Sequence, residues 1–222
     1  MLEQEAAVFI WRRVLSAVLA SEAHLDALDA VGDGDLGRSL AAGCRVALER
    51  LEAQGVRTLA QALEVTATAL GDVAASSMGT LVARGLEGAA GALPAETPLE
   101  RADAVAAVQA FAATVTRLGR AAVGDKTMVD VVVPLAELLS GLPPDLSRPA
   151  LRDRIADAVH SAVERTVPLR ARKGRARWLG EASVGQPDAG SVAVKIAVDA
   201  ALMALSATTD EPRARDDPAG RT

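Results

Sequence analysis

The sequence predicts an all-α fold, an antiparallel bundle or barrel of eight helices. Half of the 222 residues are hydrophobic, yet aromatic residues make up only 2% and there is no tyrosine. A core of alanine, leucine and valine favours closely packed helices over a β-sandwich, which draws on aromatic and β-branched side chains. No segment shows the short alternating pattern of a strand bounded by turn residues.

In the first half of the chain, helical periodicity is clearest near the N-terminus, where Val8, Trp11 and Leu15 recur at intervals of three and four residues. Gly55 marks a helix end and Thr58 is suited to cap the next helix. The predicted helices are 2–28, 36–53, 58–70 and a run from Gly79 to about 90.

In the second half, proline and glycine breaks separate longer apolar runs. Thr127 is suited to cap the helix that follows it. The predicted helices are 99–118, a run from Thr127 to 141, 147–173 and 191–205. These helices complete one domain over residues 1–207, and the charged, proline-bearing tail 208–222 is predicted to be disordered.

Composition excludes several classes of function. The formal net charge of −5 gives no reason to expect a nucleic-acid surface. Cys44 is the single cysteine, so the chain has no internal disulfide. We find no signal peptide and no apolar run long enough to span a bilayer, and we therefore expect a cytoplasmic protein with no membrane contact.

Four irregular turns, 29–35, 71–77, 119–126 and 174–190, follow the first, third, fifth and seventh predicted helices. Short connections make neighbouring helices antiparallel, so these turns all fall at the same end. A site could be assembled there from parts far apart in the sequence. Trp178, in the last turn, is either a stacking surface for a base or a packing anchor.

The first of these turns is acidic. Asp29, Asp33 and Asp35 fall within seven residues, and carboxylates this close repel one another unless a cation lies between them. Hard oxygen ligands suit magnesium or calcium. The helix that begins at Leu36 would offer free N–H groups to an anion beside the acids. The turn therefore indicates a magnesium–phosphate site, with a solvated acidic turn as the alternative.

The glycines of this turn also match two nucleotide-binding patterns as strings. Gly32, Gly34 and Gly37 have the spacing of a dinucleotide-binding motif, and 32–39 is one residue from a phosphate loop. Both motifs require a strand before the glycines, whereas a helix is predicted there. We therefore reject both interpretations.

Six short motifs lie in or beside three of these turns, in a fixed order. They are Leu25-Asp26-Ala27-Leu28-Asp29, Gly32-Asp33-Gly34-Asp35-Leu36-Gly37, Gly124-Asp125-Lys126-Thr127-Met128-Val129-Asp130, Ala171-Arg172-Lys173-Gly174-Arg175-Ala176, Leu179-Gly180-Glu181 and Asp188-Ala189-Gly190. With these motifs the chain, up to about residue 206, resembles the nucleotide-binding L subunit (DhaL-type domain) of dihydroxyacetone kinase.

The resemblance implies an eight-helix antiparallel barrel that binds Mg-ADP or Mg-ATP at one end. On matching positions, Asp29, Asp33 and Asp35 would coordinate one or two magnesium ions. The nucleotide would contact Leu36, Gly37, Arg38, Ser39, Val73, Ala74, Gly119, Thr127, Met128, Arg175, Asp188, Ala189 and Gly190.

The resemblance also implies a division of labour between subunits. This subunit would pass a phosphoryl group from bound ATP, or from ADP recharged by a phosphotransferase-system protein, to dihydroxyacetone held on a separate K-type subunit. Phosphoryl transfer requires charge neutralisation and alignment more than covalent chemistry, so acids with magnesium and helix N-termini form a plausible half-site. A homodimer is left open.

Three departures from the family pattern keep alternatives open. Asp29 is one residue closer to the Gly-Asp pair than is usual, and Leu36 stands where histidine or a small polar residue is common. The turn 71–75 lacks the usual paired glycines and Ser-Gly. The alternatives are a kinase subunit for another small ketose, such as a four-carbon sugar, and a degenerate regulatory protein that binds a nucleotide.

Overall fold

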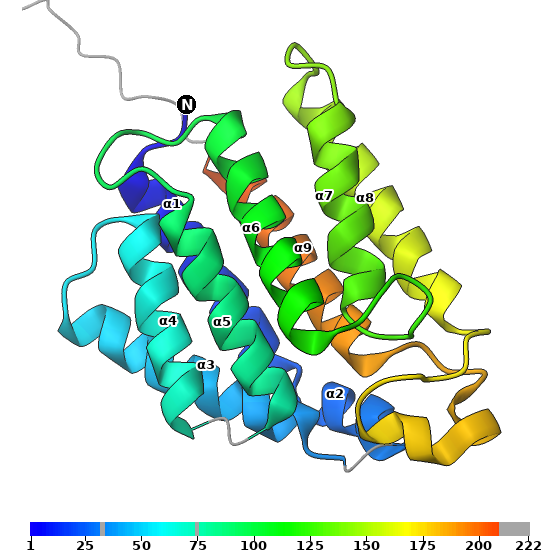
Figure 1. The fold of residues 1–222 in the computed structure, drawn as a ribbon. Helices are drawn as coiled ribbons and strands as arrows, with labels where there is room; N and C mark the ends of the chain where they lie inside the picture. Colours follow the sequence, from blue (N-terminus) through cyan, green and yellow to red (C-terminus); the bar gives the residue numbers. More distant parts are fainter. Residues whose placement is uncertain (32–33, 74–75, 209–222) are drawn as a thin grey trace, which may run out of the picture.

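The structure, a computed structural model, describes residues 1–31, 34–73 and 76–208, and these residues are helical with irregular connections (Figure 1). Their only extended pairing is an isolated bridge between Leu2 and Leu99. The all-α prediction is confirmed. The elements are α1 (Gln4–Ala20), α2 (Glu22–Leu28), the 3₁₀ turn η1 (Asp29–Val31), α3 (Leu36–Ala53), α4 (Leu59–Val73), α5 (Ser77–Gly91), α6 (Arg101–Gly119), α7 (Val129–Gly141), α8 (Arg148–Thr166), the 3₁₀ segment η2 (Arg175–Ser183) and α9 (Ala189–Ala207).

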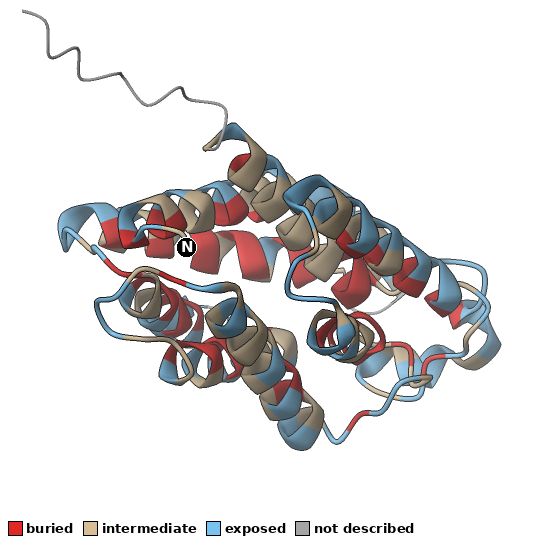
Figure 2. Ribbon diagram, turned by 90° about the horizontal axis from the view of Figure 1, so that it is seen from above, coloured by how far each residue is buried: buried red, intermediate tan, exposed pale blue. Residues whose placement is uncertain are grey.

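The eight long helices form a closed ring. Each of α1, α3, α4, α5, α6, α7, α8 and α9 packs against the next, and α9 returns to α1. Figure 2 shows the ring from above, with buried residues gathered on the faces that the helices turn toward one another. The predicted antiparallel barrel is therefore present.

Small residues bring neighbouring helices close together in this ring. A Cβ atom added to Gly43 of α3 would lie 2.3 Å from the Leu70 side chain of α4. A Cβ atom added to Gly85 of α5 would lie 2.6 Å from the Phe111 ring of α6. Helices in this barrel thus pack more closely at these glycines than larger side chains would permit, in keeping with the low aromatic content of the sequence.

Two predicted helices differ most from the structure, and α4 also runs past its predicted end at 70 to Val73. The predicted helix 2–28 is divided at Ser21 into α1 and the short α2. The predicted helix 147–173 ends at Thr166 because Pro168 has no N–H group and restricts the backbone of the residue before it. Residues 167–174 connect the end of α8 to η2, and η2 lies within the stretch that was predicted to be irregular.

Among the described residues, α9 is the one helix that is long and apolar enough to span a membrane by length and composition. The sequence prediction of no such run missed it. Core helices of globular proteins pass the same test, and α9 packs against α1 and α8 with Val192 and Ala204 buried.

Candidate functional site

A cavity of about 880 Å³ lies at the end of the barrel where the predicted turns meet. Its wall is built from residues far apart in the sequence: 28–29, 35–36, the first turns of α5, the end of α6 with the turn 119–129, and the segment 171–190. This volume lies in the range of small-molecule and cofactor sites. Antiparallel packing therefore brings residues from all four predicted turns together at one end, and Ser76 and Ser77 represent the turn 71–77.

The acidic part of the wall carries Asp29 and Asp35. Oδ2 of Asp29 accepts hydrogen bonds from the backbone N–H groups of Asp35 (3.2 Å) and Leu36 (3.3 Å). Burial raises the pKa of Asp29, and the negative charge of Asp35 adds to the rise, while the backbone hydrogen bonds oppose it. Two carboxylates in this arrangement favour a bound cation.

Asp33, the third predicted metal ligand, lies outside the described residues. Among the residues that the structure does describe, no group of three or more His, Cys, Asp or Glu side chains is placed to hold a metal. The oxygens of Asp29 and Asp35 still fit the hard-ligand preference of magnesium. The role of all three aspartates as ligands stays a prediction.

The N-terminus of α3 contributes Leu36 to the cavity wall, whereas Gly37, Arg38 and Ser39 do not line the cavity. A Cβ atom at Gly37 would lie 2.0 Å from the carbonyl oxygen of Glu22, so this glycine permits α2 to approach α3. The backbone N–H of Arg38 donates to Oδ1 of Asp26 (3.1 Å), and its guanidinium pairs with the same carboxylate. Their predicted contact with phosphate stays untested.

Ser76 links the N-termini of two helices beside the cavity, and the sequence prediction missed it. Its hydroxyl oxygen accepts hydrogen bonds from Ser39 Oγ (2.8 Å) and from the backbone N–H of Gly79 (3.0 Å). Through the second of these bonds Ser76 caps α5. Val73, predicted to contact the nucleotide, is 40% exposed and does not line the cavity, and Ala74 lies outside the described residues. A serine directly before a helical run was the available signal, because serine is a favoured N-cap residue.

The turn after α6 places Gly119, Thr127 and Met128 on the cavity wall. The buried carboxylate of Asp130 holds this turn by accepting the backbone N–H groups of Gly124 (2.6 Å) and Thr127 (2.7 Å). Lys126, which the sequence analysis quoted within a motif but did not assign to the site, also lines the cavity. Its ammonium is buried and its pKa is lowered by that burial.

The segment 171–190 forms the opposite part of the wall, and it carries the predicted residues Arg175, Asp188, Ala189 and Gly190. Asp188 caps α9 by accepting the backbone N–H of Ser191 (2.6 Å). Burial raises the pKa of Asp188 to about 6, against the lowering effect of its hydrogen bonds with Ser191. Trp178 also lines the cavity, is 77% exposed and stacks under the Arg177 guanidinium, 4.5 Å from the ring centroid.

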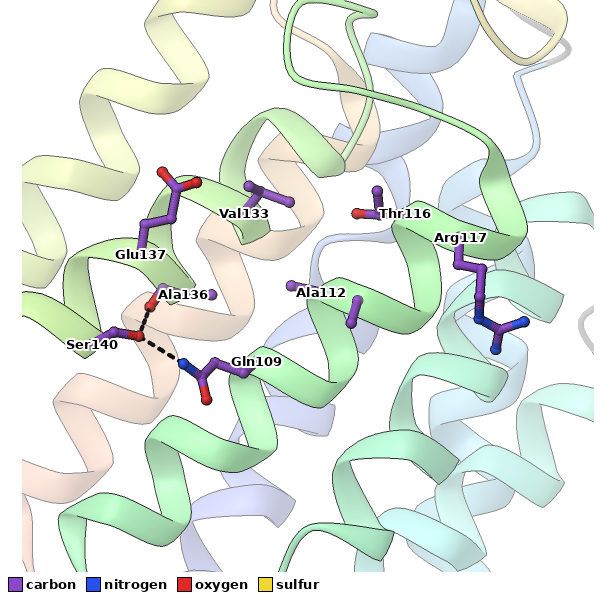
Figure 3. A pocket seen from close by; sticks show the side chains of 9 residues that line it. Gln109, Ala112, Thr116, Arg117, Val133, Ala136, Glu137 and Ser140 are labelled. Atoms are coloured by element: carbon purple, nitrogen blue, oxygen red, sulfur yellow. Dashed lines mark hydrogen bonds between the residues drawn. The ribbon is translucent and has the colours of Figure 1, made fainter.

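A second hollow, of about 400 Å³, lies between α6 and α7 (Figure 3). Gln109 donates to Ser140 Oγ (2.8 Å), and Ser140 donates to the Ala136 carbonyl (2.6 Å). Glu137 is the single acid on its wall. Because none of the predicted site residues lies here, the larger cavity is the candidate site.

The family model for the DAK2 domain matches residues 30–203 of this chain. The chain belongs to the DAK2 domain family. The match includes Asp33 and Asp35 of the acidic turn, the turn after α6 and the segment 171–190.

Curated relatives of this DAK2 domain are kinases or kinase subunits. The ADP-binding subunit DhaL of the PEP-dependent dihydroxyacetone kinase of Escherichia coli is 32% identical over 186 residues, which cover 83% of this chain and 88% of that subunit. The L-erythrulose 1-kinase of Mycolicibacterium smegmatis is 38% identical over 181 residues, covering 78% of this chain but 30% of that kinase. The resemblance to a DhaL-type domain is therefore confirmed.

A solved structure supports the same fold for the DAK2 domain. The dihydroxyacetone kinase of C. freundii in complex with AMP-PNP and Mg²⁺ superposes with a TM-score of 0.69 at 26% identity. The superposition covers 93% of this chain and 35% of that one. The barrel thus corresponds to one part of a longer kinase chain in that protein.

Proposed function

We propose that this DAK2 domain is the nucleotide-binding phosphotransferase subunit of a dihydroxyacetone-type kinase. The observation that carries the proposal is the pair Asp29 and Asp35 on the wall of a cavity that also includes the N-terminus of α3 and the segment 171–190. The subunit passes a phosphoryl group from ATP, or from recharged ADP, to a small ketose. The names of the DhaL subunits and the DAK2 match support this assignment.

Within this proposal, Asp29, Asp33 and Asp35 hold one or two magnesium ions. Bound magnesium supplies charge neutralisation at the phosphates. Leu36, at the N-terminus of α3, faces the same cavity, and a helix N-terminus favours anions. Gly119, Thr127, Met128 and Arg175 line the same cavity, which supports their proposed contact with the remainder of the nucleotide.

The ketose is proposed to be held on a separate K-type subunit. No histidine or cysteine is among the described residues that line the cavity, so this wall offers no such nucleophile or base for the sugar. The E. coli relative is itself named as one subunit of a kinase. We place the pair in the cytoplasm, with a phosphotransferase-system protein as the phosphoryl donor where ATP does not serve.

A four-carbon ketose is a second candidate substrate. Two erythrulose kinases, from Mycolicibacterium smegmatis and Pectobacterium atrosepticum, are among the similar proteins. This chain spans 30% and 33% of their length. Most of each of those kinases has no counterpart in this chain. We therefore propose that the partner subunit determines which sugar is phosphorylated.

Reconstitution tests the proposed function. The purified chain is mixed with a K-type subunit, Mg²⁺ and either ATP or a phosphotransferase-system donor, and phosphate-ester formation is measured with dihydroxyacetone and with erythrulose. We expect turnover that requires both subunits. Turnover by the K-type subunit alone, or none with any donor and sugar, would contradict the proposal.

A further inference from the structure

Lys126 is an unusual residue for its position. It is 6% exposed, and its backbone has φ of 61°, a left-handed conformation that residues other than glycine seldom adopt. A buried ammonium is costly unless its N–H groups are hydrogen-bonded. Asp130 holds the turn in which Lys126 lies by accepting the backbone N–H groups of Gly124 and Thr127.

The ammonium of Lys126 faces four backbone carbonyl oxygens. Nζ lies 2.6 Å from the oxygen of Ser183 and 2.6 Å from that of Gln186. It lies 3.0 Å from the oxygen of Leu169 and 3.5 Å from that of Val167. A lysine has three N–H donors, so the three shorter contacts account for all of them.

These carbonyls belong to the two limbs of one loop. Val167 and Leu169 lie before η2, whereas Ser183 and Gln186 lie at its end and beyond it. A single side chain therefore joins the loop at its base and attaches it to the turn after α6. Lys126 makes these bonds to both limbs from outside the loop.

The loop carries part of the cavity wall. Arg175 and Trp178 of η2 line the cavity from one side of this attachment, and Thr127 and Met128 line it from the other. Two further bonds support the same arrangement: the Arg172 N–H donates to the Asp125 carbonyl (3.1 Å), and the Ala171 N–H donates to Ser183 Oγ (2.9 Å).

We propose that Lys126 is a positioning residue that fixes the η2 loop against the turn after α6 and so sets the shape of the nucleotide cavity. This inference rests on the proposed function for the nature of the ligand. The attachment itself is independent of that function. Lys126 acts through the loop and not through contact with a reacting atom.

Hydrogen exchange of the full-length, nucleotide-free chain tests the attachment. In Lys126→Met, which keeps the aliphatic length and removes the donors, we expect exchange over 167–188 to be about ten- to a hundredfold faster than in the wild type, because hydrogen bonds from a charged group are lost. Exchange in α3, α4 and α5 should stay unchanged. Lys195→Met is the matched control, because Lys195 pairs with Asp199 on α9 and does not line the cavity.

Calorimetry with Mg-ADP on the same proteins separates positioning from general stability. At a temperature where each variant is folded, we expect Lys126→Met to weaken binding about tenfold or more and Lys195→Met to leave it unchanged. If Lys126→Met fails to fold, Lys126→Gln, which keeps two donors, should show a smaller increase of exchange in the same segment. Unchanged exchange over 167–188, or a uniform increase across all helices, would overturn the inference. Absence of Mg-ADP binding by the wild type would instead overturn the proposed function, and the exchange result would still decide the role of Lys126.

Discussion

At the scale of single residues, the cavity depends on polar groups whose burial the fold compensates with backbone hydrogen bonds. Asp29, Asp130 and Asp188 each accept backbone N–H groups at a turn or a helix start. Acids at such positions hold the local backbone and place negative charge beside the N-termini of helices. The same residues that could serve a ligand therefore also shape the wall around it.

Asp188 gives a prediction for the pH dependence of stability. Its pKa in the fold is about 6, above its ordinary value of 3.8, so the folded chain binds more protons than the unfolded chain between these values. Stability should therefore fall as the pH rises through this window and stay lower above pH 6, by up to about 3 kcal/mol. Asn also caps helices, so Asp188→Asn should retain the cap and abolish this fall.

Urea unfolding of the wild type and of Asp188→Asn, measured from pH 4 to pH 7, tests this expectation. The difference in the free energy of unfolding between the two proteins should change with pH. Parallel curves would show that burial does not raise the pKa of Asp188.

Ser76 and Ser147 form a matched pair for separating a capping role from a role in the site. Each side chain caps a helix, Ser76 at α5 and Ser147 at α8, but only Ser76 lines the cavity. Each change to alanine should cost about 1 kcal/mol of unfolding free energy. Only Ser76→Ala should weaken Mg-ADP binding in a calorimetric titration, and equal binding by both variants would remove Ser76 from the site.

At the scale of elements, close approach between α5 and α6 depends on Gly85. A Cβ atom there would lie 2.6 Å from the Phe111 ring and 2.9 Å from Val115, so Gly85→Ala should destabilise the chain by about 1–3 kcal/mol. Gly91, at the end of the same helix, has no atom within 4 Å of an added Cβ. Gly91→Ala should therefore be neutral or slightly stabilising, and a comparable loss in both variants on thermal unfolding would refute the packing argument.

Element boundaries were predictable where local chemistry decides them. The range 36–53 agrees with α3 because an acidic glycine turn precedes it and Gly55 follows it. The predicted end at 173 is wrong because Pro168 ends the helix near Thr166 although the helical period of apolar residues continues past it. The break at Ser21 has no comparable local signal.

Side chains whose role depends on distant contacts were not predictable. The ammonium of Lys126 is hydrogen-bonded to carbonyl oxygens of residues that lie 41 to 60 positions further along the chain. Nothing near Lys126 in the sequence specifies those partners. In contrast, the place of Asp29 and Asp35 at the site was predictable, because clustered acids beside a helix start are a local signal, and both residues line the cavity.

At the scale of the whole molecule, eight antiparallel helices in a closed ring bring separate turns to one end (Figure 1). Trp178 reports on that end, since it lines the cavity, while Trp11 donates to Thr66 Oγ1 (2.9 Å) elsewhere in the barrel. Binding of Mg-ADP should change the fluorescence of the wild type. The change should disappear in Trp178→Phe and persist in Trp11→Phe, and the reverse pattern would place the nucleotide elsewhere.

The central claim is that the acidic turn binds a nucleotide through magnesium, and calorimetric titration with ADP tests it most directly. We expect binding with Mg²⁺, weakened about tenfold or more when the metal is removed by EDTA and when Asp29→Asn or Asp35→Asn is titrated with Mg²⁺ present. Asp157→Asn, an exposed change on α8, should bind as the wild type does. Binding that is equal with and without metal, and equal in all three variants, would contradict the claim.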